Sequence, residues 1–346
     1  MTNATRFLFG FLVAFIVQVG TVYGGTCGCL TDCCLFDDLE VGVDVLYWHA
    51  CKTGQDYAAY VQEENGVTDV DYLSVEYRWD PGFRIHLASP LGCHCDYQLM
   101  AHYTYFWTRQ SDSADCCGDS PTTLYLESLY NPSGFPVGQL MSINTLHYQT
   151  VDLLVGRQFS LCEGHCINTF FGLQGLRLEQ NIDSRVPDCN LLCEIALWNS
   201  DYKALGFELG TDYRLSWMCG LDWIVRGAFS VVAGYQESEA YIETFVNQEE
   251  FFAFCDIISD YPLCTPGVHL QTGLSYKICY CGRHIDLHLG YEFINWWNLP
   301  QIRKLWQENI FDGTAGAVTG AGGGSTSDNG SNLMLHGLYG GIRVGF

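Results

Sequence analysis

Ionisable side chains recur at alternate positions inside otherwise apolar stretches of this sequence. Asp44, for example, stands between Val43 and Val45, so an extended chain would place the carboxylate and the two valines on opposite faces. A basic group facing lipid costs about 2–4 kcal/mol at the bilayer midplane, whereas on an inner face it can pair or stay hydrated. We therefore expect a shared polar interior, lined by Asp44, Arg84, His86, His102, Asp152, Arg157, Glu208, Arg226, His269, Lys277, Asp286, His288, Glu292 and Arg343.

The chain carries 18 cysteines, many of them in CC or CxC pairs. In an exported protein this number indicates disulfides, either within one chain or between neighbouring chains. Eleven of the 18 fall before the first predicted strand or in short turns, on one predicted face: Cys27, Cys29, Cys33, Cys34, Cys93, Cys95, Cys162, Cys166, Cys219, Cys279 and Cys281. A metal site at His94 or His165 is the weaker alternative, because two close CxxC knuckles are absent. We predict no metal and no cofactor.

Some histidines outside this polar interior are candidates for catalysis. The candidates are His49 with Asp56, and His147 with nearby acids, but no GxSxG nucleophile motif accompanies them. We therefore predict that the protein is not an enzyme, with an outer-membrane enzyme kept as an alternative.

Charge and the first residues indicate where the protein works. There are 16 lysines and arginines against 39 aspartates and glutamates, a formal net charge of −23, which argues against nucleic acid as a partner. Residues 1–24 combine Arg6, an apolar run and small residues, as a signal peptide does. We expect a cysteine-rich periplasmic segment at 25–38 and a barrel domain at 39–346.

Ten stretches show the period-two alternation of half-buried strands. Several approach the roughly 9–11 residues that cross a membrane at a tilt. The predicted strands are 39–50, 82–88, 96–107, 149–159, 167–180, 204–210, 221–235, 267–279, 284–297 and 335–346. A β-sandwich also alternates, but its strands are usually shorter.

The connections between these stretches alternate between long and short, the pattern of an outer-membrane barrel with short periplasmic turns and long external loops. Aromatic residues at the long-loop ends would form an interfacial belt: Tyr47, Trp48, Tyr105, Trp107, Tyr235 and Trp297. The predicted fold is all-β, a transmembrane antiparallel up-and-down barrel of about ten strands (8–12). The last strand, with Ile342, Val344 and terminal Phe346 on one face, reads as a barrel-insertion signal that closes against the first strand.

With this pattern in view, the chain resembles the Legionella-type major outer membrane protein family, and in particular its cysteine-rich members in Chlamydia-related bacteria. The resemblance rests on VGVDVLYWHA, WDPGFRIHL, YTYFWTR, LHLGYEFINWW and the terminal GLYGGIRVGF. It implies a pore-forming barrel in the bacterial outer membrane, and its cysteine content is similar to that of disulfide-linked chlamydial envelopes.

We therefore expect passive passage of small hydrophilic solutes, with cations favoured by the acidic surface. We expect a structural role beside it, through disulfide-linked neighbours in the envelope. The expected partners are outer-membrane lipid, these solutes and the linked neighbours. An adhesin, or a structural barrel whose lumen is closed by a salt-bridged plug, is the alternative.

Overall fold

The computed structural model describes fourteen segments of the 346-residue chain. They are residues 39–53, 56–64, 67–91, 97–115, 122–126, 139–162, 164–186, 192–217, 220–246, 249–280, 283–299, 305–306, 325–326 and 331–346. The predicted signal peptide and the cysteine-rich segment at 25–38 lie outside them. Within these segments no helix has the length and apolar character needed to cross a bilayer.

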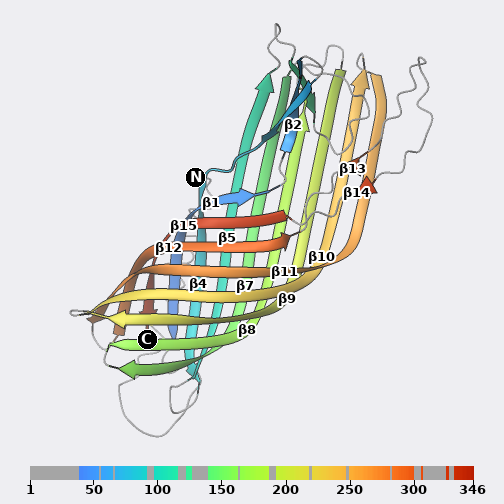
Figure 1. Ribbon diagram of the computed structural model, residues 1–346. Coiled ribbons are helices and arrows are strands. Elements are labelled where there is room, and N and C mark those ends of the chain that lie inside the picture. The colour runs from blue at the N-terminus through green and yellow to red at the C-terminus, as the bar shows by residue number, and fades with distance from the viewer. Residues whose placement is uncertain are drawn as a thin grey trace.

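Ten antiparallel strands close into a barrel (Figure 1). They are β1 (Glu40–Lys52), β4 (Trp79–Leu91), β5 (Tyr97–Asp115), β7 (Gln139–Cys162), β8 (His165–Arg185), β9 (Leu192–Ser216), β10 (Leu221–Val246), β11 (Glu249–Tyr280), β12 (Arg283–Leu299) and β15 (Ser331–Gly345). The ring runs β1-β15-β12-β11-β10-β9-β8-β7-β5-β4 and returns to β1. The predicted fold class and strand number are confirmed.

The first and last strands close the barrel. β1 and β15 pair without interruption from Glu40 opposite Gly345 to Lys52 opposite Leu333. One step further, the backbone N–H of Phe346 donates to the carbonyl of Leu39 at 3.1 Å. Ile342 and Val344 lie on the outer face of β15, as the alternation predicts. Closure leaves no unpaired strand edge in the wall.

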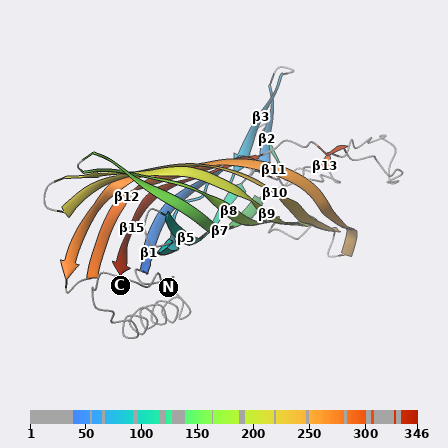
Figure 2. The same ribbon diagram turned by 90° about the horizontal axis from the view of Figure 1, so that it is seen from below.

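Two smaller sheets lie in the connections and were not predicted. β2 (Asp56–Glu64), β3 (Val67–Ser74) and β6 (Thr122–Leu126) form one, and β13 (Leu305–Trp306) and β14 (Ser325–Thr326) form the other. Figure 2 shows β2 and β3 projecting away from the barrel wall.

The strands from β7 to β11 are much longer than predicted, up to 32 residues in β11 (Figure 1). β10 and β11 pair from Leu221 opposite Tyr276 to Val246 opposite Glu249, so the external loop predicted at 236–266 is a β-ribbon. The loop predicted between β8 and β9 likewise consists mostly of strand, paired as far as Arg185 opposite Ile195. The alternation test missed these extensions because a strand above the lipid does not need an apolar outer face.

The outer surface of the barrel has an apolar band with polar residues on both sides of it. Its upper edge is the one toward the long ends of strands β7 to β11. On β7 the outward residues Val151, Leu153 and Val155 lie between Gln149 and Arg157, and the three are 46–56% exposed. Eight residue steps at about 3.3 Å give about 26 Å, which a tilt of about 40° shortens to about 20 Å, close to the apolar band of about 25 Å in outer-membrane barrels.

Charged residues mark the upper edge of this band on β8 and β9. Arg177 contacts Asp201 at 3.1 Å, and Lys203 contacts Asp201 at 2.8 Å. Partial burial raises the pKa of Asp201, hydrogen bonds from Arg177 and Lys203 lower it, and the net shift is downward. Above this level the exposed outward residues of β8, β9 and β10 include Asn181, Arg185, Asn199, Glu237 and Glu239, as expected of a surface in water.

An arginine placed in the middle of the band should test its assignment. Leu153→Arg should lower the free energy of unfolding by about 2–4 kcal/mol, because the guanidinium would face lipid. The measurement is urea unfolding of the barrel in phospholipid vesicles. As a control, Asn199→Arg adds the same charge to an exposed outward position of β9 above the band and should change stability little. Equal losses in the two variants would contradict the placement of the band.

Candidate functional site

Thirteen of the fourteen residues predicted to line the interior do point into the barrel. Each lies on the same strand face as fully buried neighbours and opposite the lipid-facing positions. They are Asp44, Arg84, His86, His102, Asp152, Glu208, Arg226, His269, Lys277, Asp286, His288, Glu292 and Arg343. The closed wall therefore brings together charges that are up to 299 positions apart in the sequence.

The prediction for Arg157 is wrong. Arg157 lies on the outer face of β7, with Val151, Leu153 and Val155, and its guanidinium lies over the rings of Tyr97 at 5.2 Å and Phe159 at 5.0 Å. The alternation itself places Arg157 outside, since it is an even number of residues from Val155. At the end of the apolar band the long side chain can keep its charge in water.

Asp44 is the centre of a first group of charges. Its carboxylate accepts hydrogen bonds from His86 at 2.6 Å and from His288 at 2.7 Å, and it forms an ion pair with Arg84 at 3.8 Å. Because a carboxylate can only accept, each imidazole donates from a protonated Nε2. Gly341 of β15 lies between Asp44 and His288, and a Cβ there would collide with Asp44 Oδ1. Glycine at this position lets β1 and β12 interact across β15.

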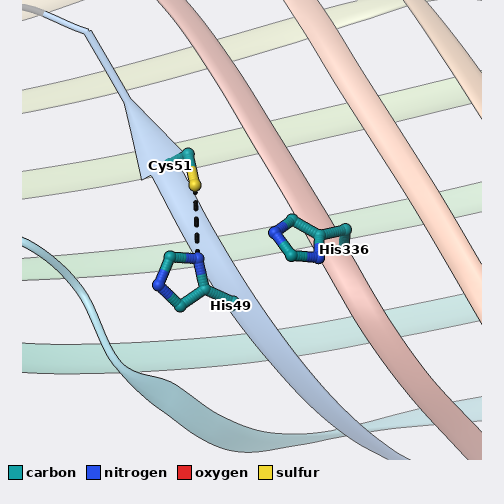
Figure 3. Close-up of side chains that lie close together, drawn as sticks. All are labelled: His49, Cys51 and His336. Carbon is teal, nitrogen blue, oxygen red and sulfur yellow. Dashed lines mark hydrogen bonds between the residues drawn. The ribbon is translucent and has the colours of Figure 1, made fainter.

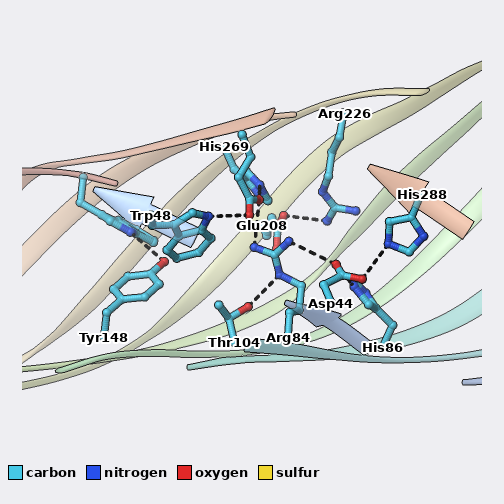
Figure 4. A network of polar contacts seen from close by, with 12 residues as sticks. Asp44, Trp48, Arg84, His86, Thr104, Tyr148, Glu208, Arg226, His269 and His288 are labelled. Atoms are coloured by element: carbon cyan, nitrogen blue, oxygen red, sulfur yellow. Dashed lines mark hydrogen bonds and ion pairs between the residues drawn. The ribbon is translucent and has the colours of Figure 1, made fainter. Parts of the chain in front are cut away.

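Glu292 on β12 is the second centre. Its three donors, Trp48, Arg84 and His269, are labelled in Figure 4. Its side chain is completely buried and accepts from Trp48 Nε1 at 3.0 Å, from Arg84 at 3.0 Å and from His269 at 2.9 Å. Arg84 also donates to Thr104 at 3.0 Å. Because Arg84 pairs with both Glu292 and Asp44, its guanidinium joins the two groups. Three donors on three different strands thus share one carboxylate.

A third group lies on the wall formed by β7 to β10. Arg226 pairs with Glu208 at 3.2 Å and with Asp212 at 3.3 Å, and it stacks over the Phe170 ring at 4.2 Å. Gln174 donates to Asp152 at 2.8 Å and to Glu208 at 3.4 Å. This group faces the Asp44 and Glu292 groups from another part of the ring.

Between these walls lies a cavity of about 420 Å³, lined by side chains of all three groups. Gln174 Oε1, Arg226 Nε and Arg343 Nε are buried and find no hydrogen-bond partner among the described residues, and all three residues line the cavity. Buried polar atoms are normally satisfied by protein or by water. A cavity of this size and polarity can supply that water.

Ion pairs among residues near the short turns extend the network of buried charges toward that end of the barrel. Lys277 lies 3.5 Å from Asp222, and Arg214 lies 3.7 Å from both Asp222 and Asp286. His102 differs from the other predicted residues, because it packs against the ring of His86, at a centroid distance of 4.8 Å.

Toward the long-strand end, the lumen is filled by an apolar layer that was not predicted. Its large residues are fully or almost fully buried and come from eight of the ten wall strands: Leu46, Trp48, Phe106, Leu146, Tyr148, Leu176, Leu178, Tyr202, Val232, Ile294, Trp296, Leu333, Leu335 and Tyr339. Trp296 Nε1 donates to the Tyr148 hydroxyl at 3.2 Å. Since β12 and β7 are five strands apart in a ring of ten, this bond crosses the lumen from wall to wall.

This layer corrects the predicted aromatic belt at one position. Tyr47 is 49% exposed on the outside, but Trp48 is fully buried inside, because successive residues of a strand face opposite sides. The available signal was the failure of alternation in LYW, YFW and INWW, where both faces are apolar.

The other predicted site residues are the cysteines and the candidate catalytic residues, and of these Cys166 lines the cavity. Cys27, Cys29, Cys33, Cys34, Cys93, Cys95, Cys219 and Cys281 lie outside the described residues, as do the side chains of Cys162 and Cys279. Cys166 is described as a free thiol that accepts a hydrogen bond from Gln158 at 2.8 Å. His147 is on the outer face, 3.3 Å from the Tyr105 hydroxyl, and the Asp56 side chain is not described.

Two solved structures show weak similarity to this chain. The Escherichia coli outer membrane protease OmpT has a TM-score of 0.43 and 10% identity, with 93% of this chain and 99% of that chain covered. A Pseudomonas aeruginosa FadL homologue has a TM-score of 0.26 and 6% identity, covering 89% of this chain and 90% of that one. At these values the likeness carries no argument about activity. No curated protein matches the chain.

A closed antiparallel barrel with an apolar outer band and a charged interior is an integral outer-membrane β-barrel. The family model described as the Legionella pneumophila major outer membrane protein precursor matches residues 31–346. The chain therefore belongs to this family, and its place is the bacterial outer membrane.

The Glu292 group should contribute far more to stability than a surface ion pair. Glu292→Gln leaves Arg84 and His269 without their buried carboxylate and should cost about 3–5 kcal/mol. Asp201→Asn removes a carboxylate that is 24% exposed and bonded to Arg177 and Lys203, and it should cost about 0–1 kcal/mol. Urea unfolding in vesicles measures both. A loss for Glu292→Gln no larger than that for Asp201→Asn would show that the buried network is not a stability determinant.

Proposed function

We propose that this protein gives small hydrophilic solutes a narrow, gated passage across the outer membrane. The observation that carries the proposal is the polar cavity, bounded on one side by a layer of buried apolar side chains. Hydrophobic constrictions in channels gate by excluding water and conduct when they widen enough to become wet. In this proposal the apolar layer is the gate and the charged cavity is the vestibule below it.

The composition of the lumen supports passage over catalysis. His86, His269 and His288 each bond to a carboxylate, and within the described part of the chain none of them bonds to a serine or cysteine that could act as a nucleophile. The arginines are likewise held by carboxylates. Such paired groups present a fixed, hydrated lining and do not form the nucleophile–base arrangement of a hydrolase.

The same layer also favours a second candidate, a structural barrel whose lumen stays closed. Ten strands enclose little more space than the roughly eight whose side chains fill the interior. The distinction is whether the apolar layer ever opens. The cross-linking role of the eleven candidate cysteines belongs to either function and remains a prediction from the sequence.

Removing the side chain that spans the lumen should separate the two candidates. Wild-type protein in planar lipid bilayers should show small, infrequent openings, and Trp296→Ala should raise the conductance severalfold because it removes the contact with Tyr148. Trp297→Ala is the matched control, since this neighbour is 38% exposed on the outer face. Silence of both the wild type and Trp296→Ala, with the barrels shown to be folded by heat-dependent gel mobility, would favour the closed structural barrel.

The charge of the lumen predicts the selectivity of the open state. Among the described inward-facing residues, the carboxylates, which include Glu40, Asp44, Asp80, Asp152, Glu208, Asp212, Asp222, Asp286 and Glu292, outnumber the cationic side chains of Lys52, Arg84, Arg214, Arg226, Lys277 and Arg343. An excess of negative charge concentrates cations. Reversal potentials in a salt gradient should therefore show cation preference, and anion preference would contradict this lining as the conduction path.

A further inference from the structure

A cluster of metal-binding residue types lies on the outside of the barrel, away from the lumen. His49 and Cys51 are on the outer face of β1, and His336 is directly opposite His49 on β15 (Figure 3). All three are half-buried, and one possible ligand atom from each lies within 4.8 Å of the others. Cys51 Sγ is 3.2 Å from His49 Nδ1.

The β1–β15 register adds a fourth donor. Met334 is paired directly with Cys51, and it lies on the outer face because its neighbours Leu333 and Leu335 are fully buried inside. Directly opposed residues have Cβ atoms about 4.5–5.5 Å apart. Two imidazoles, one thiol and one thioether therefore occupy four adjacent positions of two paired strands.

The surroundings orient one ligand and shield the cluster. The Tyr291 hydroxyl is 2.6 Å from His336 Nδ1, an arrangement that leaves Nε2 of His336 available to a metal. The Trp79 ring lies 5.8 Å from the His49 ring and 5.6 Å from the His336 ring, and it stacks on Tyr47 at 5.6 Å. These aromatic residues pack beside the cluster on β1 and β4.

The donor set defines the metal. Thiolate and thioether sulfur are soft ligands that select copper(I), and imidazole is compatible with it. Metal–ligand bonds of about 2.0–2.3 Å place tetrahedral ligand atoms about 3.5 Å apart. The present ligand atoms lie within 4.8 Å of one another, so side-chain movements of about 1 Å would bring them to this separation. Zinc shares the thiolate and imidazole preference but does not use thioether ligands.

We propose that His49, Cys51, His336 and Met334 form a copper(I)-binding site at the upper edge of the apolar band. This site is distinct from the CHC and CEGHC motifs weighed in the sequence. His94 lies outside the described residues, and His165 contacts the Tyr213 hydroxyl at 2.7 Å.

The test compares copper(I) stoichiometry in the full-length, folded, reduced protein by competition with a chromogenic copper(I) chelator. Because the chain has 18 cysteines, the informative quantity is the difference between variants. His49→Ala, Cys51→Ser and His336→Ala should each lose one tightly bound equivalent. His147→Ala and Cys166→Ser remove the same residue types elsewhere on the wall. Both variants should keep the tightly bound equivalent of copper(I).

A second measurement identifies the metal. Met334→Leu should weaken copper(I) binding at this site and leave zinc(II) binding unchanged, and copper X-ray absorption should lose one sulfur scatterer. Stoichiometry equal to wild type in the three ligand variants would overturn the site. Displacement of copper(I) by equimolar zinc(II), with no effect of Met334→Leu, would overturn the assignment to copper(I).

Discussion

The requirement that every backbone N–H and C=O find a partner inside the bilayer determines this structure. No water is available in the hydrocarbon region, so an unpaired strand edge there would cost several kcal/mol per group. The uninterrupted pairing of β1 with β15, over thirteen residue pairs, removes that edge. All other features, including the two-faced strands, the enclosed charges and the apolar band, follow from a wall that closes on itself.

Side chains near this closure support it. Asp44 on β1 bonds to His86 on β4 and to His288 on β12, which are the strands flanking the β1–β15 pair. Gly341 makes the second of these bonds possible because it leaves room beside the carboxylate. A slip of one residue would turn Asp44 toward lipid, so the buried charge also specifies the strand register.

The interior is divided along the barrel axis into two layers with different physical properties. In the charged layer, buried polar atoms that find no partner among the described residues lie next to the cavity, whereas in the apolar layer residues from eight strands pack across the lumen. Trp48 connects the two, since its ring packs with Phe106 and Tyr148 while its indole N–H bonds to Glu292. In the proposed passage, opening of the apolar layer would therefore disturb the network that Glu292 organises.

The sequence by itself determined the fold class, the ten wall strands and the inward side of thirteen charged residues. It could do so because a strand between lipid and a polar interior must alternate, and alternation is a local property of the chain. Arg157 shows how the alternation can be misapplied, because it is an even number of residues from the outward Val155 and therefore lies outside. Only the tertiary structure decided which charges meet, that an apolar layer fills the lumen, and that His49, Cys51 and His336 form one cluster. These depend on the closing register, which pairs residues nearly 300 positions apart, and no local pattern encodes that distance. The strand extensions also needed the structure, because above the lipid nothing forces one face of a strand to be apolar.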